Sequence, residues 1–127
     1  MARVLVIDDD GLFRDIVGTA LRGAGHKVDE AEDGKVGAAK FAKAAYDLVI
    51  VDMYMPKQDG IDTIFEMDAG AKGIPVIAVT GGHSMGPDSL RLAESAGADL
   101  TMEKGFTPEE LVKAVDGLLE KRKKKKK

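Results

Sequence analysis

Five polar side chains that could take part in chemistry each follow a short apolar run of this sequence. They are Asp8, Asp9, Asp52, Thr80 and Lys104. If these runs are parallel strands of one sheet, their carboxyl ends meet at the same edge, where open α/β sheets bind ligands. We therefore expect the five side chains to share a pocket.

Three of these side chains are carboxylates, which repel one another at close range. Two unit charges about 4 Å apart interact by roughly 4 kcal/mol at an effective dielectric of 20, so the group stays ionised only around a cation. Oxygen ligands without histidine or cysteine favour Mg²⁺, for which Mn²⁺ could substitute, over zinc. Lys104 adds a positive charge that can reach a phosphate, and Thr80 adds a hydroxyl donor. Such a set predicts phosphoryl transfer by positioning and charge neutralisation, with an aspartate carboxylate as a possible nucleophile.

The hydrophobic pattern alternates between strand-like and helix-like segments. Continuous β-branched runs predict strands buried on both faces at 4–7, 48–51 and 76–79, and weaker runs predict strands at 27–31 and 99–103. Helical spacing fills the gaps. Five β-α repeats with right-handed crossovers predict an α/β fold, a flavodoxin-like doubly wound five-stranded parallel sheet in the order 2-1-3-4-5 with helices on both faces.

Caps and apolar stripes predict where the helices begin and what they bury. Asp10 is the expected N-cap of the first helix, and Gly25 its left-handed terminus. Thr107, Pro108 and Glu110 predict a capping box at the start of the last helix. The residues expected to face the core are Leu12, Phe13, Ile16, Val17, Ala20, Leu21 and Ala24 of the first helix, Ile61, Ile64 and Phe65 of the third, Leu90 and Ala93 of the fourth, and Leu111, Val112, Val115, Leu118 and Leu119 of the last.

The composition is that of one soluble globular domain. The chain has 127 residues, of which 44% are hydrophobic and 32% are charged. It has no cysteine, which excludes disulfides and thiolate metal sites. No apolar run approaches the roughly 18 residues of a membrane span. The first residues show no signal peptide, so we expect a cytoplasmic protein.

Positive charge is concentrated at the C-terminus. The last seven residues are all basic, which leaves 12 basic against 22 acidic residues elsewhere and a charge of about −10 on that part. This charge argues against direct nucleic-acid binding by the body. We expect a domain over 1–120 and a disordered basic tail over 121–127, either a solvated segment or an added extension.

The order and spacing of these motifs resemble the response-regulator receiver family of two-component signalling. The resemblance covers residues 3 to about 120. It includes VLVIDDD at 4–10, DMYMPKQDG at 52–60, IPVIAVTGG at 74–82, AGAD at 96–99 and KGF at 104–106. It implies a signalling domain that promotes only its own phosphorylation and dephosphorylation, and not an enzyme acting on other substrates.

The resemblance also implies a metal site and a phosphoacceptor. Asp52 takes a phosphoryl group from a phosphohistidine on a sensor histidine kinase or a phosphotransfer protein. Asp9 and Asp52 bind Mg²⁺ with the backbone carbonyl of Tyr54, and Asp8 holds the ion through water. Residues at Tyr54 and Gly82 tune the lifetime of the aspartyl phosphate.

The switch follows from the same resemblance. Lys104 bonds a phosphoryl oxygen and Thr80 moves towards the phosphoryl group. This movement changes the surface of the fourth helix, fifth strand and fifth helix, which a downstream protein reads. The protein would be a monomer or a phosphorylation-dependent dimer.

Three departures from the family pattern affect these expectations. Gly105 stands where the family usually has a proline after a cis peptide, so we expect a trans Lys104–Gly105 bond or a rearranged loop, because a cis non-proline bond costs about 3–4 kcal/mol. Thr101 stands where the family often has an aromatic switch residue, which makes an aromatic-gated switch doubtful. The segment from Thr80 to Gly97 is about two residues longer than usual, and its glycines predict a mobile loop.

Other functions share parts of this pattern. A flavodoxin-type electron carrier needs a phosphate-binding loop after the first strand, where three aspartates would repel a phosphate. An aspartyl phosphatase usually has a cap domain, for which no sequence is left. A non-phosphorylated interaction module on a receiver scaffold stays open, as does the choice between a stand-alone receiver and the first domain of a larger regulator.

Overall fold

The computed structural model describes residues 2–53, 60–81 and 87–125. Within these ranges, five strands and five α-helices alternate, with one 3₁₀ turn before the fourth strand. Their bounds are β1 Arg3–Ile7, α1 Gly11–Gly23, β2 Lys27–Ala31, α2 Gly34–Lys43, β3 Leu48–Asp52, α3 Gly60–Met67, η1 Ala69–Lys72, β4 Val76–Thr80, α4 Pro87–Ala96, β5 Leu100–Glu103 and α5 Pro108–Lys125.

All five strands are parallel and lie in the order β2-β1-β3-β4-β5, as the sequence predicted. In register, Ile7 of β1 pairs with Val51 of β3, Asp52 pairs with Val79 of β4, and Thr80 pairs with Glu103 of β5. The residues that follow β1, β3, β4 and β5 therefore come to one edge of the sheet.

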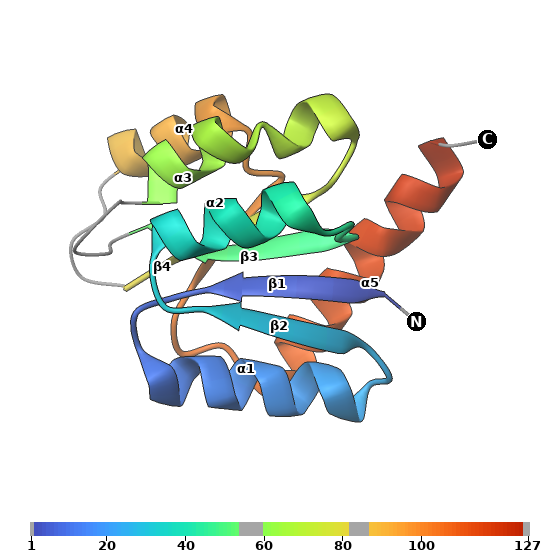
Figure 1. Ribbon diagram of the computed structural model, residues 1–127. Coiled ribbons are helices and arrows are strands. Elements are labelled where there is room, and N and C mark those ends of the chain that lie inside the picture. Colours follow the sequence, from blue (N-terminus) through green and yellow to red (C-terminus); the bar gives the residue numbers. More distant parts are fainter. Residues whose placement is uncertain (1, 54–59, 82–86, 126–127) are drawn as a thin grey trace.

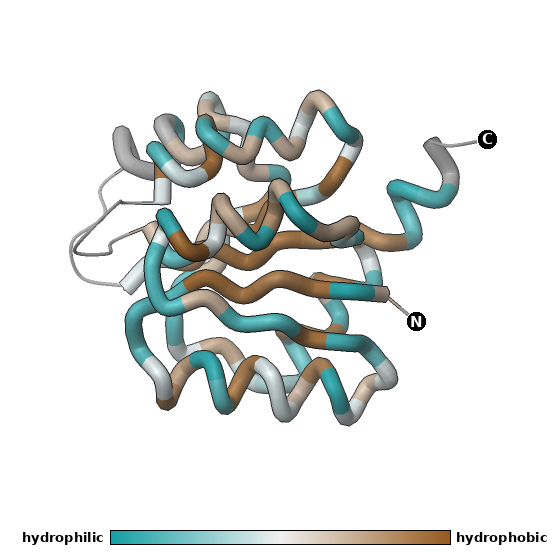
Figure 2. Tube along the Cα trace, in the orientation of Figure 1, coloured by the Kyte–Doolittle hydropathy of each residue, from teal (hydrophilic) through white to brown (hydrophobic). Residues whose placement is uncertain are grey.

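Helices cover both faces of the sheet and form a three-layer structure (Figure 1). On one face, α1 and α5 pack against Val4, Val6 and Ile50. On the other face, α2, α3 and α4 pack against Leu5 and other inward residues of the same strands. Figure 2 shows the resulting pattern, with the apolar strands at the centre and hydrophilic residues outside. No helix of the described residues is both long and apolar enough to cross a membrane.

The predicted caps are present. Asp10 Oδ1 accepts hydrogen bonds from the backbone N–H groups of Leu12 (3.0 Å) and Phe13 (3.3 Å), and Gly25 has a φ of 93°. The capping box of α5 is complete: Thr107 Oγ1 accepts from the Glu110 N–H (3.1 Å), and Glu110 Oε1 accepts from the Thr107 N–H (2.8 Å). These bonds satisfy donors that have no partner within the helix.

Four residues expected in the core are on the surface. Leu12 and Ile16 of α1 are 69% and 50% exposed, Ala24 just after α1 is exposed, and Phe65 of α3 is 62% exposed. The apolar stripe of α1 is wider than the helix face that meets the sheet. Leu12 and Ile16, four residues apart, lie along one margin of this stripe and therefore remain exposed to solvent. Phe65 follows the buried Ile64, and one step turns it about 100° away from the core.

The helix α5 continues through Lys125, beyond residue 120 where we expected disorder to begin. Lysine and arginine are good helix formers, and positive charge is favourable near a helix C-terminus. Arg122 also contacts the loop before β3, with its Nη1 2.8 Å from Asp47 Oδ1. This contact gives the end of the helix a fixed partner on the body.

Candidate phosphoacceptor site

The carboxyl edge of the sheet brings the predicted carboxylates together. One carboxylate oxygen each of Asp8, Asp9 and Asp52 lies within 4.8 Å of the other two. Asp8 and Asp52 are buried, at 1% and 5% exposure, because each follows or ends a strand covered on both faces. Asp9 is exposed. The cluster thus has two buried walls and one side open to solvent.

Asp8 is held by its own turn and by α1. Its Oδ1 accepts a hydrogen bond from the Asp10 N–H (2.9 Å), and its backbone carbonyl accepts from Arg14 Nη1 (2.6 Å). Its Oδ2 is buried and lies 3.2 Å from the Lys104 ammonium. Burial raises the pKa of the Asp8 carboxyl above its ordinary value. The hydrogen bond from the Asp10 N–H and the nearby charge of Lys104 lower this pKa, but they do not outweigh the effect of burial. A buried carboxylate grouped with two other carboxylates offers hard oxygen ligands, which fit a small divalent cation.

Lys104 places its ammonium group beside the carboxylates. Its Nζ lies 3.2 Å from Asp8 Oδ2 and 3.8 Å from Asp52 Oδ2. Burial alone would lower the pKa of this ammonium, but the charges of Asp8 and Asp52 together outweigh it and leave the pKa above its ordinary value. The group is therefore a permanent cation at the edge of the cluster.

Thr80 and Lys104 are joined through the backbone. The N–H of Lys104 donates to the carbonyl of Thr80 (2.8 Å), and Thr80 itself is buried at 1% exposure. The Lys104–Gly105 peptide is trans, as expected, and Gly105 has a φ of 112°. This left-handed conformation suits glycine, so the residue that replaces the family's proline gives the loop a different turn.

Thr101 lies on the edge strand β5, in register with Ala78. The position at which the family often has its aromatic switch thus holds a short, half-buried hydroxyl side chain. The expectations for Tyr54, Gly82 and the loop glycine Gly86 fall outside the described residues.

Sequence reasoning missed the residues that support the site. It assigned Phe13 to the core alone, whereas the Lys104 Nζ lies 4.6 Å from the centre of its ring. It did not foresee that Arg14 would bind the backbone of Asp8. The only sequence signal for either contact is a position within one helical turn of the Asp10 cap.

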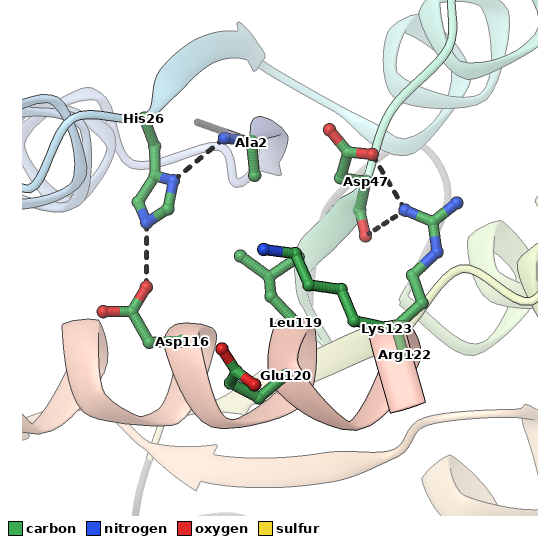
Figure 3. A pocket seen from close by; sticks show the side chains of 8 residues that line it. All are labelled: Ala2, His26, Asp47, Asp116, Leu119, Glu120, Arg122 and Lys123. Atoms are coloured by element: carbon green, nitrogen blue, oxygen red, sulfur yellow. Dashed lines mark hydrogen bonds and ion pairs between the residues drawn. The ribbon is translucent and has the colours of Figure 1, made fainter. Parts of the chain in front are cut away.

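A second polar cluster lies at the opposite edge of the sheet, in a surface pocket of about 460 Å³ (Figure 3). His26 Nδ1 accepts from the Ala2 N–H (3.2 Å), which makes Nε2 the protonated nitrogen of a neutral ring and the donor to Asp116 (2.9 Å). The pair between Arg122 and Asp47 closes the other end of the pocket. These contacts fasten α5 to the rest of the domain, and no sequence pattern predicted a role for His26.

Comparison with known proteins agrees with this geometry. The sequence pattern of the response regulator receiver domain matches residues 4–116. The transcriptional regulatory protein ResD of Bacillus subtilis is 34% identical over 118 residues, which are 92% of this chain and 48% of the relative. More broadly, the chain spans 15% to 53% of the length of the curated relatives compared with it.

Solved structures give the same result. A CheY-like receiver domain protein from Methanospirillum hungatei superposes with a TM-score of 0.92 at 25% identity, over 98% of both chains. Chemotaxis protein CheY4 of Vibrio cholerae superposes with a TM-score of 0.86 at 31% identity, over 93% of this chain and 98% of that one. With an all-parallel 2-1-3-4-5 sheet and this sequence match, the chain belongs to the response-regulator receiver domain family of two-component systems.

Proposed function

We propose that this receiver domain accepts a phosphoryl group on Asp52, binds Mg²⁺ at Asp8, Asp9 and Asp52, and changes its α4-β5-α5 surface in response. The observation that supports this most strongly is the meeting of three carboxylates and the Lys104 ammonium at one sheet edge. The donor is the phosphohistidine of a sensor histidine kinase or a phosphotransfer protein.

The proposed nucleophile is Asp52, which ends the central strand β3 and is buried. One of its carboxylate oxygens forms a bond to phosphorus while the phosphorus–nitrogen bond of the phosphohistidine breaks. The imidazole leaves with the bonding electrons and takes up a proton. Asp52 thus becomes an aspartyl phosphate, and no oxidant or reductant is needed.

The direct metal ligands would be the carboxylates of Asp9 and Asp52 with the backbone carbonyl of Tyr54. Asp8 would act through water, as the family resemblance implies. When bound, Mg²⁺ neutralises charge on the carboxylates and on the phosphoryl oxygens. The burial of Asp8 beside two other carboxylates supports a cation at this place.

Lys104 and Thr80 would connect the phosphoryl group to the output surface. The Lys104 ammonium lies near the carboxylates of both Asp8 and Asp52 in this structure, and after phosphorylation it would bond a phosphoryl oxygen instead. Because the Lys104 N–H is bonded to the Thr80 carbonyl, a movement at the end of β4 shifts the end of β5 as well. In energetic terms, the phosphoryl group shifts the equilibrium between two conformations in which the same elements pack differently.

The downstream partner is a protein that reads this surface, in a chain that acts either alone or as one domain of a longer regulator. Gly105 and Thr101 favour a second candidate, an interaction module that does not use phosphorylation. The meeting of three carboxylates with the Lys104 ammonium at one sheet edge supports the first.

Beryllofluoride, which mimics an aspartyl phosphoryl group, separates the two candidates. Amide NMR spectra are recorded with Mg²⁺, with and without the analogue, for the wild type, Asp52→Asn and Asp15→Asn. Asp15 is an exposed carboxylate on α1 and serves as the matched control. Analogue-dependent shifts in β4, β5 and α5 of the wild type and Asp15→Asn, but not of Asp52→Asn, support the proposal. Mg²⁺ binding without any response to the analogue in the wild type would favour the interaction module.

A further inference from the structure

A pair of aromatic rings lies behind the ammonium group of Lys104. The Nζ of Lys104 is 4.6 Å from the ring centre of Phe13, well within the roughly 6 Å at which a cation is attracted to a ring face. The ring of Phe13 meets that of Phe106 edge to face, with centres 5.9 Å apart and an interplanar angle of 71°. This is a favoured geometry for two aromatic rings.

The position of Phe13 is fixed by the same turn that builds the acidic cluster. The Asp10 side chain bonds the N–H of Phe13 (3.3 Å), while the Asp10 N–H bonds Asp8 Oδ1 (2.9 Å). The ring is half-buried and packs against the α1–α5 side of the core. Phe13 therefore cannot move far without disturbing the start of α1.

The loop that follows Lys104 is less constrained on its other side. Its backbone is held by the bond from Lys104 N–H to Thr80, but the next residue, Gly105, is exposed and has no heavy atom near the position of a Cβ. The ammonium therefore depends on side-chain contacts for its place. Of these, Asp8 and Asp52 pull it into the cluster and Phe13 lies under it.

We propose that Phe13 is a positioning residue for Lys104: its ring face holds the ammonium at the mouth of the carboxylate cluster, in reach of a phosphoryl oxygen on Asp52. Phe106, two residues after Lys104, braces the ring from the β5–α5 loop. The inference rests on the proposed function, because it concerns how Lys104 meets the phosphoryl group. The contact itself, however, exists without any ligand.

Two measurements on the full chain test the proposal. The first is the chemical shift of the Lys104 ε-methylene protons without Mg²⁺ or analogue, assigned by loss of the signal in Lys104→Arg. A ring below the side chain moves this signal upfield. We expect the shift in the wild type and Phe13→Tyr, which keeps the ring face, and its loss in Phe13→Leu. An ordinary lysine value in the wild type would overturn the proposal.

The second measurement is the affinity for beryllofluoride at saturating Mg²⁺. Phe13→Leu should bind about 2- to 30-fold more weakly, the range expected for a lost cation–π contact at a partly desolvated site. Phe13→Tyr should restore binding. Phe65→Leu removes an exposed phenyl ring from α3 and should bind as the wild type does.

The outcomes separate this inference from the proposed function. If the wild type binds the analogue and Phe13→Leu binds equally well, Phe13 has no positioning role, although the phosphoacceptor account stands. If the wild type binds no analogue, the phosphoacceptor account fails, and the ring-current shift alone decides whether Phe13 holds the ammonium. Should Phe13→Leu fail to fold, the wild-type shift and the Phe13→Tyr affinity still test the contact.

Discussion

Gly60 is the position at which one methyl group should damage the site most. It is the first residue of α3 and packs directly on the end of β3. A Cβ built at Gly60 would lie 2.4 Å from the carbonyl oxygen of Asp52 and 2.6 Å from the Cα of Met53. Ordinary contact begins at 3.4 Å, so backbone would have to move by about 1 Å. No side-chain rotation can relieve this clash, because both neighbours are backbone atoms.

The cost of Gly60→Ala follows from this displacement. Overpacking typically costs about 1–3 kcal/mol, which exceeds the roughly 0.5–1 kcal/mol that alanine gains over glycine inside a helix. We expect a net loss of about 1–2 kcal/mol in the free energy of unfolding. A displacement of about 1 Å at a reacting group can also cost up to about 100-fold in rate, so phosphorylation of Asp52 should fall steeply.

Urea denaturation and phosphorylation by a small-molecule donor measure the two effects. Gly117→Ala is the matched control, because Gly117 is exposed inside α5 and an added Cβ meets no atom within 4 Å. It should gain about 0.5–1 kcal/mol and keep wild-type phosphorylation. If Gly60→Ala were as stable and as active as Gly117→Ala, the close packing of α3 on the phosphoacceptor strand would be wrong.

Three further changes test other parts of the structure. Burial and the hydrogen bond to Asp29 raise the pKa of Tyr46 to about 12. The protonated Tyr46 therefore contributes at most about 3 kcal/mol to the free energy of unfolding, in full below pH 10, and this contribution is lost as the pH rises from 10 to about 12. Absorbance titration with the other tyrosine changed to phenylalanine should show this late ionisation, and an ordinary value near 10 would contradict it. Thr107→Ala should cost about 1 kcal/mol in urea denaturation, because the capping box loses its hydroxyl, and an unchanged midpoint would contradict the cap. Arg122→Ala should remove the contact with Asp47 and lower amide exchange protection at the end of α5, with less than about 1 kcal/mol of global loss; unchanged protection would show that the contact holds nothing.

The fold could be predicted because each level of the sequence agrees with the next. The segment 48–52 is continuously apolar up to its final aspartate. This pattern predicts both a buried strand and the end of that strand, where the aspartate reaches the edge of the sheet. Asp10 and Thr107 form the expected caps because a cap depends on only three or four adjacent residues. The meeting of Asp8 and Asp52 could also be predicted, because each lies at the carboxyl end of a strand and the two strands are neighbours in the predicted order.

The remaining features depend on contacts between distant segments, which periodicity does not encode. Leu12 and Phe13 are both apolar neighbours in α1, yet one is exposed and the other lies under Lys104, because only the packing of α5 decides between them. The end of α5 is helical where charge alone predicted disorder, and its partner Asp47 lies 75 residues away. Such long-range pairs become visible only in three dimensions.

The central claim is that Asp52 accepts the phosphoryl group, and intact mass spectrometry after incubation with acetyl phosphate and Mg²⁺ tests it most directly. The account predicts one added phosphoryl group on the wild type, removed by hydroxylamine as an acyl phosphate must be, and none when Mg²⁺ is chelated. Asp52→Asn should gain none, while Asp15→Asn should match the wild type. Equal phosphorylation of Asp52→Asn, or an unmodified wild type whose Mg²⁺ binding is intact, would contradict the account.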